Sequence, residues 1–241
     1  MSMFHSQPFV AEPRSETERA YGLLRAELLA GALAPGARLR PGDLQARLSV
    51  GLTPIREALT RLGVEGLIVG ESQRGFRVKD VSLTEFADLM ETRRELELAC
   101  LTRAIKRGDA AWEAEIVAAM HLLARTPLPG TPDDRAAADL WESRHRVFHF
   151  ALVSACGSPW RLQFWRTLYD HAERYRKFRL LHHREPAARV RAVNAEHQRI
   201  MAAVLARDTP KATRLMDAHL SATERAVSAM LRDAGAPATR G

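Results

Sequence analysis

The sequence has few cysteines and no long hydrophobic run. Only Cys100 and Cys156 occur among its 241 residues, and they form no Cys-x-x-Cys pair. Their separation argues against a zinc ribbon or a redox dithiol and predicts two small buried residues. No apolar stretch approaches the roughly 18–20 residues that span a bilayer, and the N-terminus lacks a basic region followed by an apolar segment. The sequence therefore predicts a cytoplasmic protein without a membrane segment.

Common catalytic signatures are missing as well. The chain contains no His-Glu-x-x-His motif, no glycine-rich phosphate loop and no Ser/His/Asp order typical of hydrolases. Its formal net charge of +7 suits a polyanionic partner, but it also suits an arginine-rich protein without one. These absences disfavour an enzyme and leave binding functions open.

An amphipathic helix with a basic face is predicted to begin at Thr53. Thr53 can cap the helix, and Pro54 suits its first position because no backbone N–H is needed there. Apolar residues at helical spacing predict one buried face: Ile55, Ala58, Leu59 and Leu62. The opposite face carries Thr53, Arg56, Thr60 and Arg61.

Two short β-rich runs follow this helix. They cover residues 67–69 and 76–78, with Arg74 and Gly75 at the turn between them. A basic-faced helix followed by such a hairpin is the layout of a winged helix-turn-helix, in which the helix enters the DNA major groove and the hairpin touches the neighbouring backbone or minor groove. An ordinary α+β subdomain with solvated arginines is the alternative interpretation.

Four motifs follow one another in this part of the chain. They are Gly31-x-Leu33-x-Pro35-Gly36-x-Arg38-Leu39, Thr53-Pro54-Ile55-Arg56-Glu57-Ala58-Leu59-x-x-Leu62, Glu65-Gly66-Leu67-Ile68 and Gly75-Phe76-x-Val78. In this order they closely resemble the N-terminal domain of GntR-family transcription regulators. The resemblance implies that Thr53 and Arg56 contact operator DNA and that Gly75 is the glycine of the wing tip. The other predicted DNA contacts are Arg38, Arg61 and Arg74.

The motif departs from the family at one place. Gly51-Leu52 stands where the family usually has Ser-Arg, so one base-reading arginine of the family is absent. The operator sequence therefore cannot be borrowed from relatives.

The patterns predict two domains. Residues 1–13 lack periodicity and are expected to be mobile, and a capping box at Ser15 and Glu18 begins a winged helix-turn-helix domain over residues 14–80. Residues 81–232 are predicted to form an all-α domain, followed by a disordered tail at 233–241. The predicted helices of the second domain cover about 83–106, 109–125, 133–155, 160–182, 188–206 and 210–232. The predicted fold class is mainly α: three helices and a β-hairpin, followed by a bundle of about six helices.

Four histidines of the second domain have spacings that suit a metal site. His145 and His149 lie at i and i+4 on one helix face, so their imidazoles can reach one ion. His197 and His219 lie in two later helices, and antiparallel packing could bring them opposite the first pair. The alternative to a metal site is that these histidines are packed in the core or reach solvent with their ring nitrogens, as histidines on amphipathic helices commonly do.

Several motifs surround these histidines. They are Arg93-x-x-Leu96-Glu97, Phe148-His149-x-Ala151-Leu152 with Cys156-Gly157-Ser158-Pro159, Glu196-His197, and the stretch from Asp208 to His219. Together they resemble the FCD ligand-binding domain of the FadR-type branch of the GntR family. The resemblance implies a divalent metal, zinc or nickel, held by three histidines and an Asp or Asn four residues before the first. His149, His197 and His219 match the histidines, whereas His145 occupies the Asp/Asn position.

This departure has an electrostatic consequence. A neutral imidazole in place of a carboxylate leaves more of the ion's positive charge uncompensated, so the site should favour an anionic ligand. We predict a small carboxylate or dicarboxylate effector that touches the metal and pairs with Arg93. Arg93 could instead form an i,i+4 pair with Glu97. Residues 145–160 and 173–176 also resemble the sub-branch containing the carbon-starvation regulator CsiR, which makes glutarate or a related C4–C5 acid a candidate.

These patterns are compatible with three functions. We predict a ligand-responsive repressor that binds, as a homodimer, a pseudo-palindromic double-stranded operator with half-sites about one DNA turn apart. The alternatives are a metal-dependent hydrolase and an architectural DNA-binding protein without an effector. Glu196 could serve as the base of a hydrolase, but adjacent helix positions point about 100° apart, so it should face away from His197. An architectural role leaves the four histidines unexplained.

Overall fold

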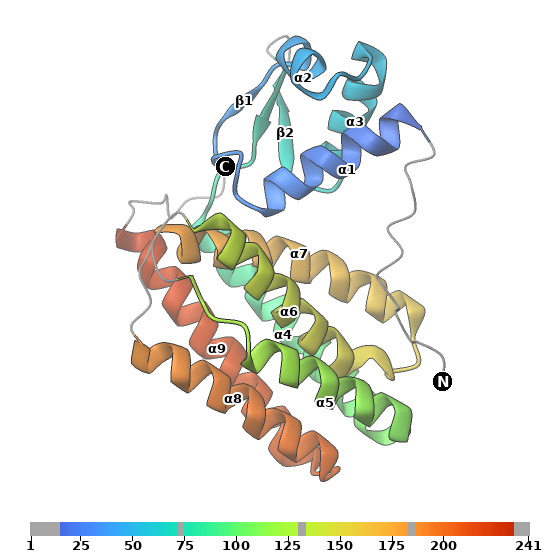
Figure 1. Cartoon of the computed structure of the whole chain (residues 1–241), viewed down its shortest axis with the longest axis vertical. Coiled ribbons are helices and arrows are strands. Elements are labelled where there is room, and N and C mark those ends of the chain that lie inside the picture. The colour runs from blue at the N-terminus through green and yellow to red at the C-terminus, as the bar shows by residue number, and fades with distance from the viewer. Residues whose placement is uncertain (1–14, 72–74, 130–133, 183–186, 234–241) are drawn as a thin grey trace. The chain divides into compact units, whose positions relative to one another are not determined.

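The computed structural model describes residues 15–71, 75–129, 134–182 and 187–233 (Figure 1). The chain divides into two compact units. The first comprises the residues up to Leu28 together with Ala32–Asp80, and the second comprises Leu29–Gly31 and the residues from Val81 onward. The expected mobile segment 1–13 and the tail after Asp233 lie outside the described residues.

The first unit combines three helices with a small antiparallel sheet. The helices are α1 (Glu16–Leu29), α2 (Pro41–Leu48) and α3 (Leu52–Val64), and the strands are β1 (Arg38–Leu39), β2 (Ile68–Glu71) and β3 (Gly75–Val78). The predicted hairpin is confirmed as β2 and β3, and β1 pairs with the other side of β3 through Arg38 and Leu39. The sequence did not reveal β1 because a two-residue strand shows no alternation.

Helix α3 begins earlier than the sequence suggested. Its N-cap is Gly51 and not Thr53, and no side chain caps the helix. The carbonyl of Gly51 already accepts a bond from the Ile55 N–H at 3.2 Å, so the first turn starts there. The amide of Gly51 donates to Glu16 Oε2 at 3.3 Å, which ties this end of α3 to α1. The four apolar residues predicted to face the core, Ile55, Ala58, Leu59 and Leu62, are fully buried.

The second unit is all-α in its described part. Its helices are α4 (Leu83–Arg107), α5 (Ala110–Ala124), α6 (Arg135–Ser154), α7 (Pro159–His182), α8 (Ala187–Leu205) and α9 (Thr209–Asp233). Side-chain caps begin several of them. Ser82 Oγ accepts from the Glu85 amide at 3.4 Å, and Asp109 Oδ1 accepts from the Trp112 amide at 2.9 Å. The predicted six-helix bundle is therefore confirmed.

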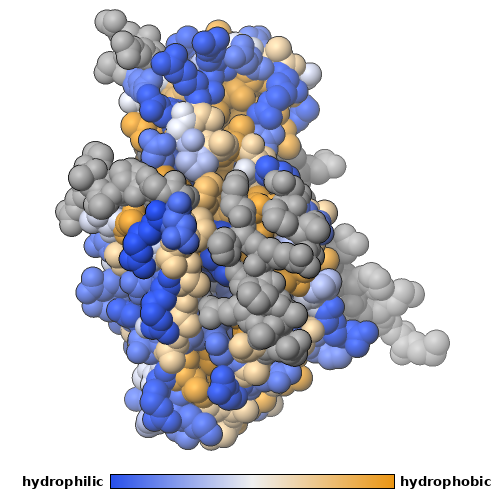
Figure 2. All heavy atoms as spheres, turned by 90° about the vertical axis from the view of Figure 1, so that its left-hand side faces the viewer, coloured by the Kyte–Doolittle hydropathy of each residue, from blue (hydrophilic) through white to orange (hydrophobic). Residues whose placement is uncertain are grey.

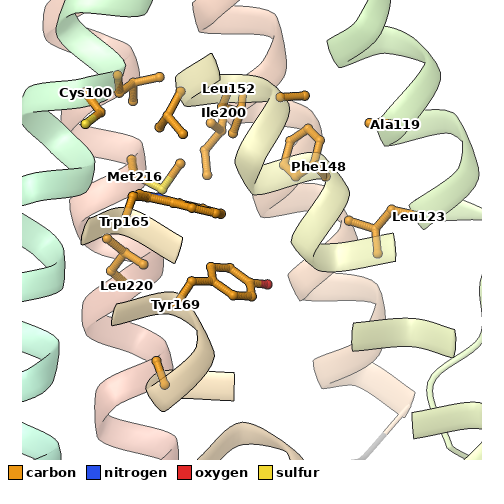
Figure 3. Packing of buried hydrophobic residues seen from close by; sticks show 14 of the residues in the cluster. Cys100, Ala119, Leu123, Phe148, Leu152, Trp165, Tyr169, Ile200, Met216 and Leu220 are labelled. Carbon is orange, nitrogen blue, oxygen red and sulfur yellow. The ribbon is translucent and has the colours of Figure 1, made fainter. Parts of the chain in front are cut away.

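Helix α4 is central in this bundle. It packs against α6, α7 and α9, while α5 contacts α6 and α8, and α8 contacts α9. Figure 3 shows Trp165 and Tyr169 of α7 in the interior with Met216 and Leu220 of α9 and Phe148 of α6. Cys100 and Cys156 are buried and form no disulfide, as predicted. Side chains from several helices thus meet in one core.

Hydrophilic residues cover much of the face shown in Figure 2, with hydrophobic residues scattered among them. Among the helices of the described residues, none combines the length and apolar character required to cross a bilayer.

Candidate functional site

The exposed face of α3 carries the residues predicted to contact DNA. Thr53, Arg56 and Arg61 are exposed there, and Arg38 is exposed on β1. The buried face of α3 holds the helix on the core, so the opposite face is left for a partner. This arrangement is that of a helix available for the major groove.

The predicted DNA contacts differ in their interactions with the rest of the first unit. The guanidinium of Arg61 lies over the Tyr21 ring, 3.7 Å from its centroid, and its Nε is 3.6 Å from Glu65 Oε1. Arg61 therefore takes part in the packing of α3 on α1. Gly75 begins β3 with a φ of 90°, a conformation that L side chains rarely adopt. Arg74, the other predicted tip residue, lies outside the described residues.

The second unit brings the four predicted metal ligands together. His145 and His149 come from α6, His197 from α8 and His219 from α9. One nitrogen of each lies within 4.8 Å of the others, and all four side chains are buried. Figure 1 shows why residues so distant in sequence can meet, since α6, α8 and α9 belong to the same bundle.

Two carboxylates fix the orientation of two imidazoles. Glu97 Oε1 lies 2.7 Å from His149 Nδ1, and Glu196 Oε2 lies 2.8 Å from His219 Nδ1. A carboxylate accepts, so each Nδ1–H donates and each Nε2 keeps its lone pair. Such carboxylate–histidine pairs are typical of metal-binding histidines.

Burial keeps three of the four imidazoles neutral. It lowers the pKa of His149 to about 4 against the opposing effect of Glu97, and, with neighbouring histidines, it lowers the pKa values of His145 and His197. Burial would raise the pKa of Glu97, but Arg93 and His149 bring it down to about 2. At neutral pH the contact between Glu97 and His149 is therefore a hydrogen bond from a neutral ring to a carboxylate. Neutral imidazole is the form that binds a metal.

The donor set fits a divalent metal ion. His149 Nε2 is buried and has no hydrogen-bond partner among the described residues. His197 Nε2 and His219 Nε2 are 3.3 Å apart. Two nitrogens on one tetrahedral zinc ion would be about 3.3–3.4 Å apart, given Zn–N distances of about 2.0–2.1 Å. The cluster can therefore supply up to four nitrogen ligands after a small contraction of its wider pairs.

Arg93, the residue predicted to bind the effector, forms the i,i+4 ion pair with Glu97 that was the alternative prediction. Its Nε donates to Glu97 Oε2 at 3.0 Å, and the side chain is almost fully buried. Its Nη2 has no partner among the described residues. Arg93 thus supports Glu97, which in turn holds His149.

Sequence reasoning missed two residues of α7 that complete the site. Tyr169 Oη lies 2.6 Å from His145 Nδ1, and Arg176 forms a two-point ion pair with Glu142, at 3.1 Å from Nε and 2.9 Å from Nη2. The guanidiniums of Arg93 and Arg176 each lie 4.6 Å from the Tyr169 ring centroid. The spacing of Tyr169 and Arg176, two turns apart on one helix, is the signal that could have found them.

A small cavity of about 20 Å³ borders the histidine cluster. Its walls include Trp141, His145, Arg176, Val193, Glu196 and His219. Glu196 is directed to His219 and not to His197, in agreement with the separation expected for adjacent helix positions. Because Glu196 holds the Nδ1 proton of His219, its position is that of an orienting group and does not favour the hydrolase alternative.

Comparisons with known proteins agree with both units. Residues 16–78 match the model of the "Bacterial regulatory proteins, gntR family", and residues 88–222 match that of the FCD domain. The HTH-type transcriptional regulator BphR of Paraburkholderia xenovorans (strain LB400) is 38% identical over 89% of this chain and 86% of its own length. The HTH-type transcriptional repressor GlaR of Escherichia coli (strain K12) is 36% identical over 83% and 90%.

Solved structures show the same fold. E. coli McbR/YncC superposes with a TM-score of 0.73 at 23% identity, covering 92% of this chain and 99% of that chain. A putative transcriptional regulator GntR from Rhodococcus sp. RHA1 gives a TM-score of 0.69 at 25% identity, with 88% and 96% covered. The chain belongs to the GntR family of bacterial regulatory proteins and is a DNA-binding transcriptional regulator with an FCD domain.

Proposed function

We propose that this regulator is a homodimeric repressor that binds a divalent metal ion, zinc or nickel, through His145, His149, His197 and His219 and responds to a small carboxylate. The observation that carries the proposal is the buried four-histidine cluster, in which two rings are held by carboxylates with their Nε2 atoms available. The name of the relative GlaR, a repressor, supports repression. We expect the protein to act in the cytoplasm, where bacterial operator DNA lies.

On the DNA side, we propose contacts from Arg38, Thr53, Arg56 and Arg61, with Arg74 and Gly75 at the wing. Their support is the exposed face of α3 and the position of Gly75 at the start of β3. A homodimer would present two such faces to a pseudo-palindromic operator. Arg56 is the residue we expect to read a base edge, because a guanidinium can bond two acceptors of one guanine.

On the effector side, the protein supplies orientation and charge. Glu97 and Glu196 hold protons on the Nδ1 atoms of His149 and His219. A bound divalent ion would supply positive charge to which a carboxylate oxygen can bind. Buried arginines with unused donors would attract the same anion, and Arg93, the residue predicted from sequence, has one such donor at Nη2.

We propose that effector binding shifts helices of the second unit and thereby reorients the DNA-binding units of the dimer, which releases the operator. Thermodynamic linkage makes this coupling reciprocal, so saturating operator DNA must weaken effector binding by the same factor.

The test combines metal analysis with calorimetry. Purified protein should contain about one metal ion per chain, a His149→Ala/His197→Ala variant should contain none, and a panel of C2–C6 mono- and dicarboxylic acids should be titrated into the metal-loaded protein with and without operator DNA. A metal-free wild type would contradict the metal site. Absence of binding by every acid would contradict the effector class, and an affinity unchanged by operator would contradict the coupling.

A further inference from the structure

The cavity beside the histidine cluster offers a place where a ligand atom can lie next to an ion held there. Its walls contain His145 and His219, two of the four proposed metal ligands, so it borders the ion position directly. Arg176 and Arg179 are the arginines of its walls, whereas Arg93 is not part of them. A carboxylate bound in this cavity would therefore meet arginines of α7.

We propose that Arg176 is the residue that binds the effector carboxylate beside the metal, and that Arg93 is a positioning residue acting through Glu97. This inference rests on the proposed metal and carboxylate function. It assigns the carboxylate contact to a residue that the sequence patterns did not single out.

The geometry of Arg176 prepares it for an anion. Its side chain is 3% exposed, and Glu142 occupies its Nε and Nη2 while Nη1 has no hydrogen-bond partner among the described residues. The two-point pair with Glu142 fixes the plane of the guanidinium, so little conformational entropy is lost when a second carboxylate binds at Nη1. A buried donor without a partner is costly, and an incoming oxygen would satisfy it.

Arg93 has a different position. Its Nε is bound to Glu97, whose other oxygen holds His149, so the pair acts on the orientation of one imidazole. Arg93 and Arg176 both contact the ring of Tyr169, each 4.6 Å from its centroid. Of these two arginines, only Arg176 combines an unused donor with a place in the cavity wall.

Charge and size define the ligand. The charged residues that line the cavity or support the histidines balance in sign: Arg93, Arg176, Arg179, Glu97, Glu142 and Glu196. A divalent ion would leave this buried site with excess positive charge, which an anion offsets. A cavity of about 20 Å³ has room for about one water-sized group, so without movement of its walls it admits one carboxylate oxygen and not the rest of the acid.

The test separates binding of the metal from binding of the acid. Zinc-loaded wild type, Arg176→Lys and Arg93→Lys are titrated calorimetrically with glutarate, succinate and acetate, and zinc affinity is measured separately by chelator competition. Arg176→Lys keeps a positive charge beside Glu142 but loses the guanidinium fork. We expect it to weaken binding of the preferred acid about tenfold or more while zinc affinity stays within about threefold of wild type. The matched variant Arg93→Lys should chiefly weaken zinc, by about tenfold or more, through His149.

Three results would overturn the assignment. Wild-type affinity for the acid in Arg176→Lys would refute Arg176 as the carboxylate contact and leave the proposed effector class intact. A larger loss of acid affinity in Arg93→Lys than in Arg176→Lys would return the role to Arg93. Absence of binding by all three acids in zinc-loaded wild type would refute this assignment together with the proposed effector. If Arg176→Lys does not fold, the double variant Glu142→Gln/Arg176→Gln, which removes both buried charges together, is judged by the same acid and zinc affinities.

Discussion

Removing two of the four histidines should abolish the stabilisation of this protein by zinc. The perturbation is His149→Ala/His197→Ala, which takes one ligand from α6 and one from α8 and leaves a pair that cannot enclose an ion. Zinc at about 100 times its dissociation constant stabilises a folded protein by about 2.7 kcal/mol when the unfolded chain does not bind it. For a protein of 241 residues this corresponds to a rise in melting temperature of about 5–11 °C.

The assay is a thermal melt of each protein with excess chelator and with zinc or nickel. Each variant is compared with its own metal-free form, because removing His149 also leaves the buried Oε1 of Glu97 without its hydrogen-bond donor and lowers stability by about 1–3 kcal/mol. We expect the rise in the wild type and none in the double variant. His121→Ala is the matched control, since His121 is exposed on α5 and should leave the rise intact.

Two outcomes would refute the reasoning. An equal rise in wild type and double variant would show that the metal binds elsewhere. A wild type that melts at the same temperature with chelator, zinc and nickel would reduce the four histidines to packing residues.

Three further predictions concern other parts of the chain. Arg56→Ala should weaken binding to a specific operator by about 1–3 kcal/mol with little effect on binding to random DNA. If a filter-binding series shows an equal loss of affinity on both duplexes, Arg56 is a phosphate contact. Arg61→Ala should also lower the melting temperature, because Arg61 packs on α1. The pKa of Glu173 is lowered overall in the folded protein: burial acts to raise it, but Arg146 and other basic neighbours outweigh burial. The ionised carboxylate therefore stabilises the fold above the usual glutamate pKa. This stabilisation is lost as the pH falls through the pKa that Glu173 has in the folded protein. Glu173→Gln should therefore flatten the acid limb of a stability–pH profile, and an unchanged limb would contradict this. Gly75→Ala should destabilise the first unit by about 1–2 kcal/mol in denaturant melts, because alanine is strained at the positive φ of this position although its side chain meets no clash. Unchanged stability of the variant would show that the end of the strand can relax.

Periodicity predicted much of the fold. The apolar stripe of α3, the capping box at Ser15 and the helical segments of the second unit could all be predicted because they depend on local spacing. The start of α3 and strand β1 were not, since a glycine N-cap leaves no side-chain signal and two residues show no period. In each case the missing information was a long-range bond, from Gly51 to Glu16 or from β1 to β3.

The candidate site divides in the same way. The i,i+4 spacing of His145 and His149, and the in-phase positions of His197 and His219, identified a possible cluster from the sequence alone. The sequence could also state that Arg93 and Glu97 are able to pair, but not whether they do. Their contact depends on both being buried beside His149, which is a property of the packed bundle.

The sequence by itself determined the helix faces, the ligand types and the motifs of a GntR-family regulator with an FCD domain. Only the tertiary structure decided which charged residues surround the histidines: Glu196 turns to His219, Tyr169 meets His145, and Arg176 lines the cavity. The physical reason is that a helix fixes the direction of its side chains locally, whereas contacts between residues far apart in the chain depend on how helices pack.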